Sequence, residues 1–243
     1  MPTTHQPTAW EDPATRRAWT KLFVCAALGQ VFWPVAWVGL LAWYVIISAT
    51  WTLWLFFVPM AYTFYRTFLQ WAYWRGAFRS RRLLQEYPWQ VYEAPESGIG
   101  NIPGVRNGYA WLRFPHPEVP DQQVTMVMHS HVRSVWWGGR LGKRAKTERK
   151  AQVREIWFAG DPRFAAVIAV RGPRHLYVIS QRPPDDNGDV TVDAQGAAPH
   201  ALERARRAGM RVPDPHVTTP SIQESGPGIV GAEKCADTAD ENR

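Results

Sequence analysis

The residues best suited to metal chemistry are two histidines, His129 and His131, which are separated by one serine. Residues two apart on a β-strand point to the same face, so both imidazoles could reach one ion. His116 is a third candidate ligand, but zinc sites usually have three or four ligands, and no cysteine stands at ligand spacing. We therefore favour a solvated polar strand face over a metal site, and we expect no cofactor.

The highest density of charge lies in Arg140–Arg154, RLGKRAKTERKAQVR, which holds seven basic residues and one acid. Such a run is most often a solvated loop, and anionic lipid and nucleic acid are its two functional alternatives. Nucleic acid is considered because Trp136 and Trp137 precede the run, and single strands bind where aromatic rings stack beside basic groups. The candidate contacts to a partner, lipid or nucleic acid are Arg140, Lys143, Arg144, Lys146, Arg149, Lys150, Trp136 and Trp137.

No sequence motif for catalysis is found. The GIGNIPG stretch from Gly98 to Gly104 is not a phosphate-binding loop, because no Lys-Ser/Thr pair follows it. Patterns for serine hydrolases, zinc proteases and Cys–His enzymes are missing from the soluble part of the sequence. Asp161 is expected to be a turn residue rather than a general base. An enzyme would need a pocket that gathers Asp161 with His116, His129 and His131.

These groups belong to a chain dominated by one apolar run, Leu22 to Tyr65, which has 44 residues and no Asp, Glu, Lys, Arg or His. A single helix of that length would be about 66 Å long, more than twice the thickness of a bilayer core of about 30 Å. We therefore predict a transmembrane hairpin with spans near 22–47 and 52–71 and a turn between them. Pro34 is expected to kink the first span.

Basic residues flank the apolar run at both ends and are missing from the predicted turn. Arg16, Arg17 and Lys21 precede the run, and a cluster of arginines follows it. By the positive-inside rule, both ends lie in the cytoplasm. The arginines predicted to contact lipid headgroups beside the membrane are Arg75, Arg79, Arg81 and Arg82.

Beyond Tyr87 the sequence changes to short apolar runs separated by Gly, Pro, Asn and Asp, which indicates strands and turns. With little helix between them, these strands predict a small antiparallel barrel or sandwich whose last three strands form a meander. The six predicted strands are 89–93, 109–114, 124–132, 153–159, 164–170 and 176–180. The predicted core is Trp111, Val124, Met126, Met128, Trp157, Phe164, Val167, Ile168, Tyr177 and Ile179.

The charge balance changes sign after residue 182. Residues 1–182 hold 22 Lys or Arg and 10 Asp or Glu, whereas residues 183–243 hold 6 and 11. No aromatic residue follows Tyr177, so we predict a disordered tail with a transient helix over 201–209. The predicted α+β membrane protein comprises a flexible arm (1–18), the transmembrane hairpin (19–75), a basic juxtamembrane helix or linker (76–87), a cytoplasmic β-domain (88–182) and the disordered tail (183–243).

Two sequence stretches, LLQEYPWQVY after the hairpin and IWFAGDPRFAAVIAVRGPRHLYVIS near the end of the β-domain, carry a family resemblance. Over roughly residues 20–182 the chain resembles small membrane proteins of high-GC actinobacteria, although Arg171-Gly172-Pro173 stands where a Gly-Gly turn would be expected. The resemblance implies a two-helix hairpin with a cytoplasmic β-domain, and no catalytic residue.

Together these patterns predict a multi-pass protein of the bacterial inner membrane with both termini cytoplasmic. The favoured function is a membrane-anchored, non-enzymatic interaction module. Its partner would be a protein or anionic lipid headgroups. The alternative is a membrane-tethered nucleic-acid-binding β-domain that uses Arg140–Arg154 with Trp136 and Trp137.

Overall fold

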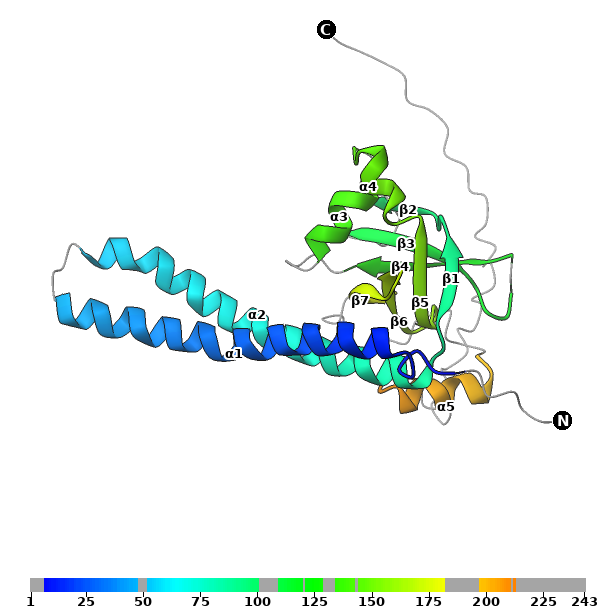
Figure 1. The fold of residues 1–243 in the computed structure, drawn as a ribbon, viewed down its shortest axis with the longest axis horizontal. Helices are drawn as coiled ribbons and strands as arrows, with labels where there is room; N and C mark the ends of the chain where they lie inside the picture. The colour runs from blue at the N-terminus through cyan, green and yellow to red at the C-terminus, as the bar shows by residue number, and fades with distance from the viewer. Residues whose placement is uncertain are drawn as a thin grey trace, which may run out of the picture. The chain divides into compact units, whose positions relative to one another are not determined.

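The computed structural model describes residues 7–47, 52–100, 109–119, 121–128, 134–142, 144–181, 197–210 and 212. It combines two long helices with one seven-stranded antiparallel sheet (Figure 1), so the chain is α+β as predicted. Residues 1–212 form one compact unit. The long helices and the sheet therefore share a common packing.

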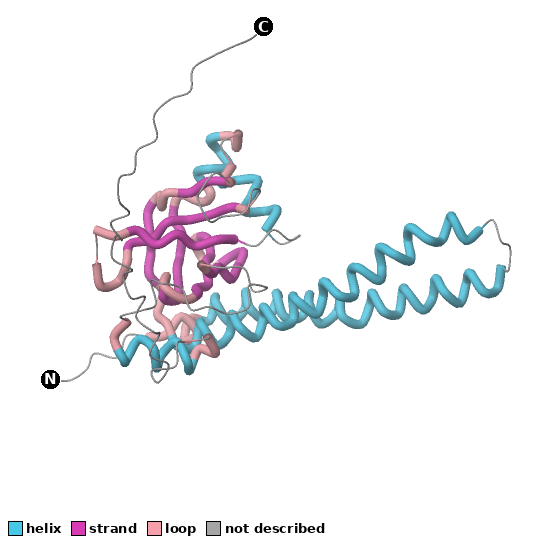
Figure 2. Tube along the Cα trace, turned by 180° about the vertical axis from the view of Figure 1, so that it is seen from behind, coloured by secondary structure: helices cyan, strands magenta, loops and turns pink. Residues whose placement is uncertain are grey.

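The two long helices are α1, Pro13–Ile47, and α2, Thr52–Glu86. They run antiparallel and side by side (Figures 1 and 2), joined by ring contacts such as Trp33 with Tyr62. Helix α1 continues through Pro34 to Ile47. Among the described helices, α1 alone is long and apolar enough to cross a membrane. Most of the predicted turn, residues 48–51, lies outside the described part of the chain.

Gly29 of α1 leaves room for a side chain of α2 at the helix interface. A Cβ atom at Gly29 of α1 would lie 2.6 Å from the side-chain amide of Gln70 on α2. Small residues at helix interfaces allow this kind of close contact, which is typical of helix pairs in membranes. The pair is therefore held by close packing as well as by its aromatic rings.

Both ends of the helix pair differ from the predicted boundaries. Helix α1 begins within the stretch 1–18 that we predicted as a flexible arm, and Asp12 caps it by accepting the Ala14 N–H at 2.9 Å. Ala9 is buried, and its N–H donates to the Tyr87 carbonyl oxygen at 2.9 Å. The stretch 76–87, predicted as a basic juxtamembrane helix or linker, is helical as far as Glu86 and continuous with α2.

The strands form a single sheet in the order β1-β5-β6-β7-β4-β3-β2, with every neighbouring pair antiparallel. Their bounds are β1 Gln90–Glu93, β2 Ser97–Ile99, β3 Ala110–Pro115, β4 Gln123–Met128, β5 Glu155–Asp161, β6 Ala165–Val170 and β7 Arg174–Ser180. The sheet is curled (Figure 2), with β1 and β2 at its two edges. The described strands thus form an open, curled sheet rather than the predicted closed barrel or two-sheet sandwich.

The predicted meander is confirmed as β5, β6 and β7, which are consecutive in the sheet. Strand β2 was not predicted, because Ser97–Ile99 is short and contains Gly98; it is stabilised by pairing with β3. The predicted strand 124–132 is described only as far as Met128, and the remainder lies outside the described residues.

Three short helices complete the described elements, and the sequence interpretation anticipated only the last of them. Helices α3, Val135–Leu141, and α4, Thr147–Ala151, occupy part of the basic run that we interpreted as a loop. Helix α5, Pro199–Arg207, overlaps the transient helix predicted over 201–209 in the tail, and its Ala205 is fully buried against the rest of the fold. This part of the tail is therefore structured, whereas residues 183–196 and 213–243 lie outside the described part of the chain.

Strand β6 is buried along its whole length, because both faces of the sheet are covered. On one face the sheet contributes Leu112, Phe114, Met126, Ile156, Phe158, Ile168 and Ile179, which pack with Trp137 and Leu141 of α3. On the other face Ala159, Ala165, Val167, Ala169 and Leu176 pack against Trp19, Leu83, Leu84 and Tyr87 and against Ala205 and Ala208 of α5. The long helices and α5 therefore serve as one layer of the β-domain.

Seven of the ten predicted core residues are buried: Val124, Met126, Met128, Val167, Ile168, Tyr177 and Ile179. The other three, Trp111, Trp157 and Phe164, are half-buried. Their rings are wide and lie where the sheet meets its edges or turns. For example, the Trp111 ring covers Gly98 of the edge strand β2, and its N–H donates to the Gly100 carbonyl at 3.0 Å.

Candidate functional site

The basic run divides into an exposed part and a structural part. The side chains of Arg144, Lys146, Arg149 and Lys150 are exposed on and around α4, while Lys143 lies outside the described residues. Arg140 is half-buried; its Nε donates to Gln152 Oε1 and its Nη1 to the Trp136 carbonyl, each at 2.8 Å. Arg140 is thus committed to holding the chain between α3 and β5.

Trp136 and Trp137, predicted as stacking platforms for nucleic-acid bases, pack against other residues of the β-domain. Trp137 is 1% exposed, and its N–H donates to the His175 carbonyl at 3.2 Å. The Trp136 ring lies 3.8 Å from the parallel His175 ring and 3.8 Å from the Arg140 guanidinium. Two planar groups at that distance from one ring must cover its two opposite faces. Neither indole therefore offers a free face to a nucleic-acid base.

The candidate metal ligands are not assembled within the described structure. His129 and His131 lie outside the described residues. The third candidate, His116, accepts the backbone N–H groups of Glu118 and Val119 on its Nδ1, at 3.2 and 3.1 Å. In the described ranges no three His, Cys, Asp or Glu side chains come together as a metal site.

Asp161 is the last residue of β5 and the first of the β5–β6 turn, where its carbonyl accepts the Phe164 N–H at 3.0 Å; it also belongs to a charged cluster that the sequence did not reveal. Its carboxylate accepts the Arg163 amide N–H at 3.0 Å and the Arg163 Nε and Nη2 at 3.1 and 2.8 Å. Arg163 is 2% exposed and also donates Nη1 to Glu118 at 2.6 Å. Arg163 holds the pKa of the Glu118 carboxyl below its usual value by hydrogen bonding. This arrangement ties the β5–β6 turn to the loop after β3.

The four predicted headgroup contacts lie along the last turns of α2. Arg75, Arg81 and Arg82 are exposed, and Arg79 is half-buried. The guanidinium of Arg81 lies over the rings of Trp10 and Trp19, at 5.2 and 5.4 Å from their centroids. These residues share one helix near the β-domain, where positive charge and aromatic rings alternate.

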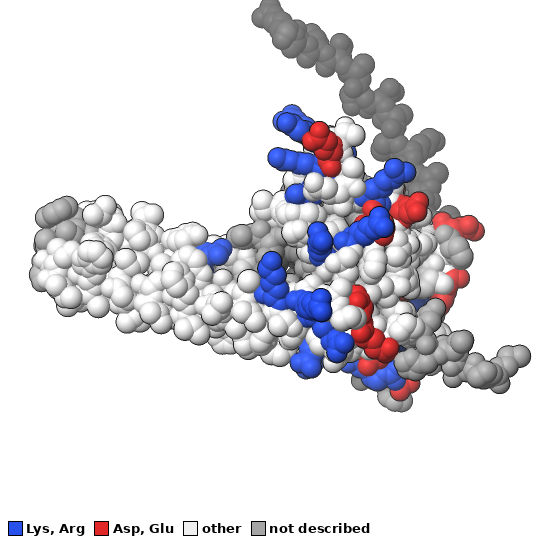
Figure 3. Space-filling view, in the orientation of Figure 1, with Lys and Arg blue, Asp and Glu red and all other residues white. Residues whose placement is uncertain are grey.

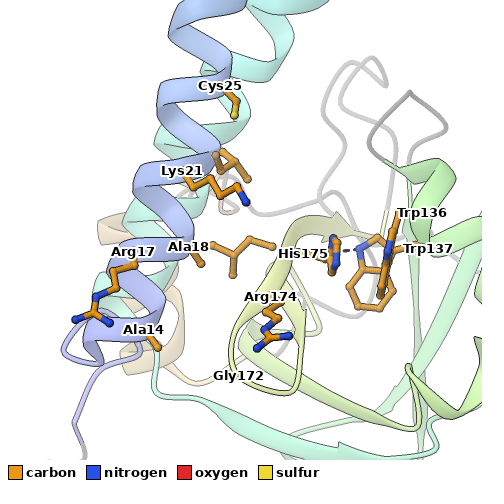
Figure 4. Close-up of a pocket in the computed structure, with 12 residues that line it drawn as sticks. Ala14, Arg17, Ala18, Lys21, Cys25, Trp136, Trp137, Gly172, Arg174 and His175 are labelled. Carbon is orange, nitrogen blue, oxygen red and sulfur yellow. Dashed lines mark hydrogen bonds between the residues drawn. The ribbon is translucent and has the colours of Figure 1, made fainter.

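A cavity of about 700 Å³ lies between α1, α3 and the turn from β6 to β7 (Figure 4). It is lined by Ala14, Arg17, Ala18, Lys21, Leu22, Cys25, Trp136, Trp137, Gly172, Arg174, His175 and Leu176. Its residues come from three segments far apart in sequence. Pairing of β6 with β7 and packing of α1 on the sheet bring them together.

Positive charge dominates this cavity, because its lining includes Arg17, Lys21 and Arg174 and no acidic residue. In Figure 4 the Lys21 side chain points toward the His175 ring, whereas the Arg17 guanidinium is turned away from it. Burial lowers the pKa of His175, and the nearby cations Arg140, Arg174 and Lys21 lower it further. The cavity therefore favours an anion over a cation.

This cavity was not predicted from the sequence, although three of its polar residues, Lys21, Arg174 and His175, stand beside recognisable features. Lys21 ends the basic stretch before the apolar run, and Arg174 and His175 follow the Gly172-Pro173 turn. Nothing in their spacing shows that the two segments meet. Comparisons with protein-family models, with curated proteins and with solved structures found no match.

Proposed function

We propose that the protein is a membrane-anchored, non-enzymatic interaction module that presents its β-domain at the cytoplasmic face of a bacterial inner membrane. In this proposal α1 and α2 both cross the bilayer as a hairpin, and both termini are cytoplasmic. The partner is anionic lipid or a protein that meets the domain at the membrane surface.

The observation that carries this proposal is the exposure of apolar side chains along α1. Leu28, Val31, Val35 and Ile46 are 65%, 66%, 64% and 80% exposed. Leaving such a side chain in water rather than burying it costs about 1.5–3 kcal/mol. A helix that is apolar all round and not covered by protein needs lipid around it.

Helix α2 supports the second span in the same way. Trp54, Leu55 and Val58 are 81%, 67% and 69% exposed, beside the apolar end of α1. Its mean hydropathy is reduced by aromatic residues, by Pro59 and by Arg66. The Arg66 guanidinium lies 5.0 Å from the Trp33 ring centroid on α1. Basic groups within membrane helices usually face protein, so this arginine is compatible with a span.

The orientation is supported by where charge lies. Lys and Arg gather where the two long helices meet the β-domain, while most of the visible hairpin surface carries no charge (Figure 3). Lys21 on α1 and the arginines of α2 from Arg75 onward belong to this zone. Because basic residues are retained on the cytoplasmic side, this distribution of charge supports a cytoplasmic β-domain.

The nucleic-acid alternative retains exposed cations at Arg144, Lys146, Arg149 and Lys150. It lacks aromatic rings on which bases could stack, since the faces of Trp136 are covered and Trp137 is buried. Nonspecific binding through cations alone would fall steeply with salt. We therefore favour lipid or protein over nucleic acid as the partner.

Cysteine accessibility in intact cells tests the hairpin. Cys25 and Cys235 are replaced by serine, and single cysteines are placed at Thr50, in the predicted turn, and at His200, on α5. A membrane-impermeant maleimide is expected to label the Thr50→Cys variant from outside. The His200→Cys variant should react only after the cells are permeabilised.

A third variant, Thr8→Cys, controls for the N-terminal side and should behave like His200→Cys. Labelling of the positions 50 and 200 from the same side would contradict a hairpin that crosses the membrane. Opposite labelling of positions 8 and 200 would mean an odd number of spans, which the proposal excludes.

A further inference from the structure

The cavity between α1, α3 and the β6–β7 turn combines a basic mouth, a fixed aromatic floor and an apolar wall. We propose that it binds the anionic headgroup of one membrane phospholipid, with an acyl chain lying along α1. This inference rests on the proposed membrane anchoring and names the site and the lipid class. The described volume of about 700 Å³ suits a headgroup with its glycerol and the start of a chain.

The charge of the cavity selects an anion. Lys21 and Arg174 are exposed, and neither forms an ion pair with any residue in the described part of the chain. Lys21 lines the cavity from α1 and Arg174 from the start of β7, and in Figure 4 the Arg174 guanidinium is directed away from the Lys21 ammonium. A phosphate in the cavity would be attracted by both cations, and the lining offers no carboxylate to repel it.

The floor is held rigid before any ligand arrives. The His175 ring stacks on Trp136 at 3.8 Å with an angle of 16° between their planes. The His175 carbonyl accepts the Trp137 N–H at 3.2 Å, which joins β7 to α3 (Figure 4). His175 has a positive φ of 54°, an uncommon conformation for a residue other than glycine that these contacts help to hold. A preformed floor lowers the entropic cost of binding.

The apolar wall points to a lipid rather than a soluble phosphate compound. Leu22 and Cys25 line the cavity on α1. Beyond Cys25, on the same stripe of α1, the surface continues with Leu28, which is 65% exposed. The cavity thus opens onto the surface that the proposal places in the membrane. A free phosphate ester would make no use of that continuity, whereas an acyl chain would cover it.

The test is native mass spectrometry of the full-length protein in detergent, with dioleoylphosphatidylglycerol, dioleoylphosphatidylcholine or glycerol 3-phosphate added. We expect one phosphatidylglycerol to bind more tightly than phosphatidylcholine. The Lys21→Gln/Arg174→Gln variant should lose about 25-fold in affinity, at about fivefold for each charge. The matched control Arg154→Gln/Arg171→Gln removes two exposed charges outside the cavity and should bind like the natural protein.

The conservative variant Lys21→Arg/Arg174→Lys keeps both charges and should retain binding, which separates loss of charge from misfolding. Alkylation of Cys25, in a Cys235→Ser background, should slow when phosphatidylglycerol is present. Equal binding by the cavity variant and its control would overturn the proposal. Binding of glycerol 3-phosphate as tightly as the lipid would overturn the assignment to a phospholipid.

The result of this lipid-binding experiment does not depend on whether the two helices cross the membrane as a hairpin. In detergent the cavity needs only α1, α3 and β7, so lipid binding can be observed even if α2 does not cross the membrane. Conversely, correct labelling at the positions 50 and 200 with no lipid selectivity would leave the anchored module standing and remove the lipid site.

Discussion

At the scale of single residues, the most constrained charge in the described structure is Arg163. Its side chain is 3% exposed and joins Asp161, at 9%, to Glu118, at 39%. An arginine in this position is stable only because both carboxylates meet it directly, and one of them also accepts the Ala198 N–H at 3.2 Å. The cluster therefore links the sheet with the chain entering α5.

We predict that Arg163→Met destabilises the protein by about 3 kcal/mol, because it leaves the buried Asp161 carboxylate without its partner. Arg113→Met is the matched control. Its ion pair with Glu96 is exposed at 35% and 60%, so it should cost less than about 1 kcal/mol. Urea unfolding of the full chain in detergent measures both. Equal shifts in the two midpoints would contradict a structural role for Arg163.

The pKa of His175 depends on the positive charges that line the cavity. Its pKa is lowered by burial and by Arg140, Arg174 and Lys21, so the ring is neutral at pH 7. We predict an NMR titration midpoint below the ordinary value of about 6.5. The Lys21→Gln/Arg174→Gln variant should raise it, since two of the repelling cations are lost.

Binding of phosphatidylglycerol should raise the same midpoint, because a nearby anion favours the imidazolium. Lipid binding should then strengthen modestly as the pH falls through that midpoint. The Arg171→Gln variant, whose side chain lies outside the cavity, should leave the titration unchanged. A midpoint that responds to none of these changes would remove the electrostatic argument for the site.

At the scale of elements, the β5–β6 hairpin is built around one glycine. Gly160 has φ 155°, and a Cβ placed there would lie 2.4 Å from the Ala166 Cα and 2.5 Å from the Ala165 carbonyl oxygen. These are backbone atoms of the paired strand β6, which is buried on both faces and cannot move aside. The close pairing of the two strands therefore requires glycine at this position.

Gly160→Ala is predicted to destabilise the fold by at least about 2 kcal/mol, because overpacking and backbone strain add. Gly139→Ala in α3 is the control; apart from the neighbouring residues and backbone of its own helix, no heavy atom lies within 4 Å of the added methyl, and alanine favours helix by about 1 kcal/mol. Thermal unfolding followed by circular dichroism compares the two. A similar melting temperature for both variants would contradict this prediction, because it would show that β6 can shift to accommodate the added methyl group.

At the scale of the whole molecule, Trp19 connects the long helices with the β-domain. It is 8% exposed, and its N–H donates to the Ala77 carbonyl on α2 at 2.8 Å. The ring stacks on Phe23 and belongs to the core formed with Leu83 and with the outer face of the sheet. The long helices and the β-domain thus share one core, and the stretch 76–87, predicted as a basic helix or linker, is the helical end of α2.

We predict that Trp19→Ala costs about 3–5 kcal/mol and raises hydrogen exchange in β6 and β7, because it opens the core between helices and sheet. The control is Trp54→Ala, since Trp54 is 81% exposed on the far part of α2 and touches lipid in the proposed arrangement. The Trp54→Ala variant should leave hydrogen exchange in β6 and β7 unchanged. Protection of β6 that survives Trp19→Ala would contradict a shared core.

Local patterns were enough to predict most of the elements. The uncharged run from Leu22 to Tyr65 predicts long apolar helices because length and hydropathy are local properties. Short apolar runs between turn residues predict six of the seven described strands and the meander from β5 to β7. The basic residues around the run indicate an orientation by the same local logic.

The tertiary structure alone decided which of these residues meet. Trp136 and His175 lie 39 positions apart, and Arg163 and Glu118 lie 45 apart, so no spacing rule could pair them. Docking of α5 and the open form of the sheet likewise depend on surfaces contributed by distant segments. The candidate lipid cavity exists only because α1 packs against β7, and contacts of that kind follow from the fold rather than from periodicity.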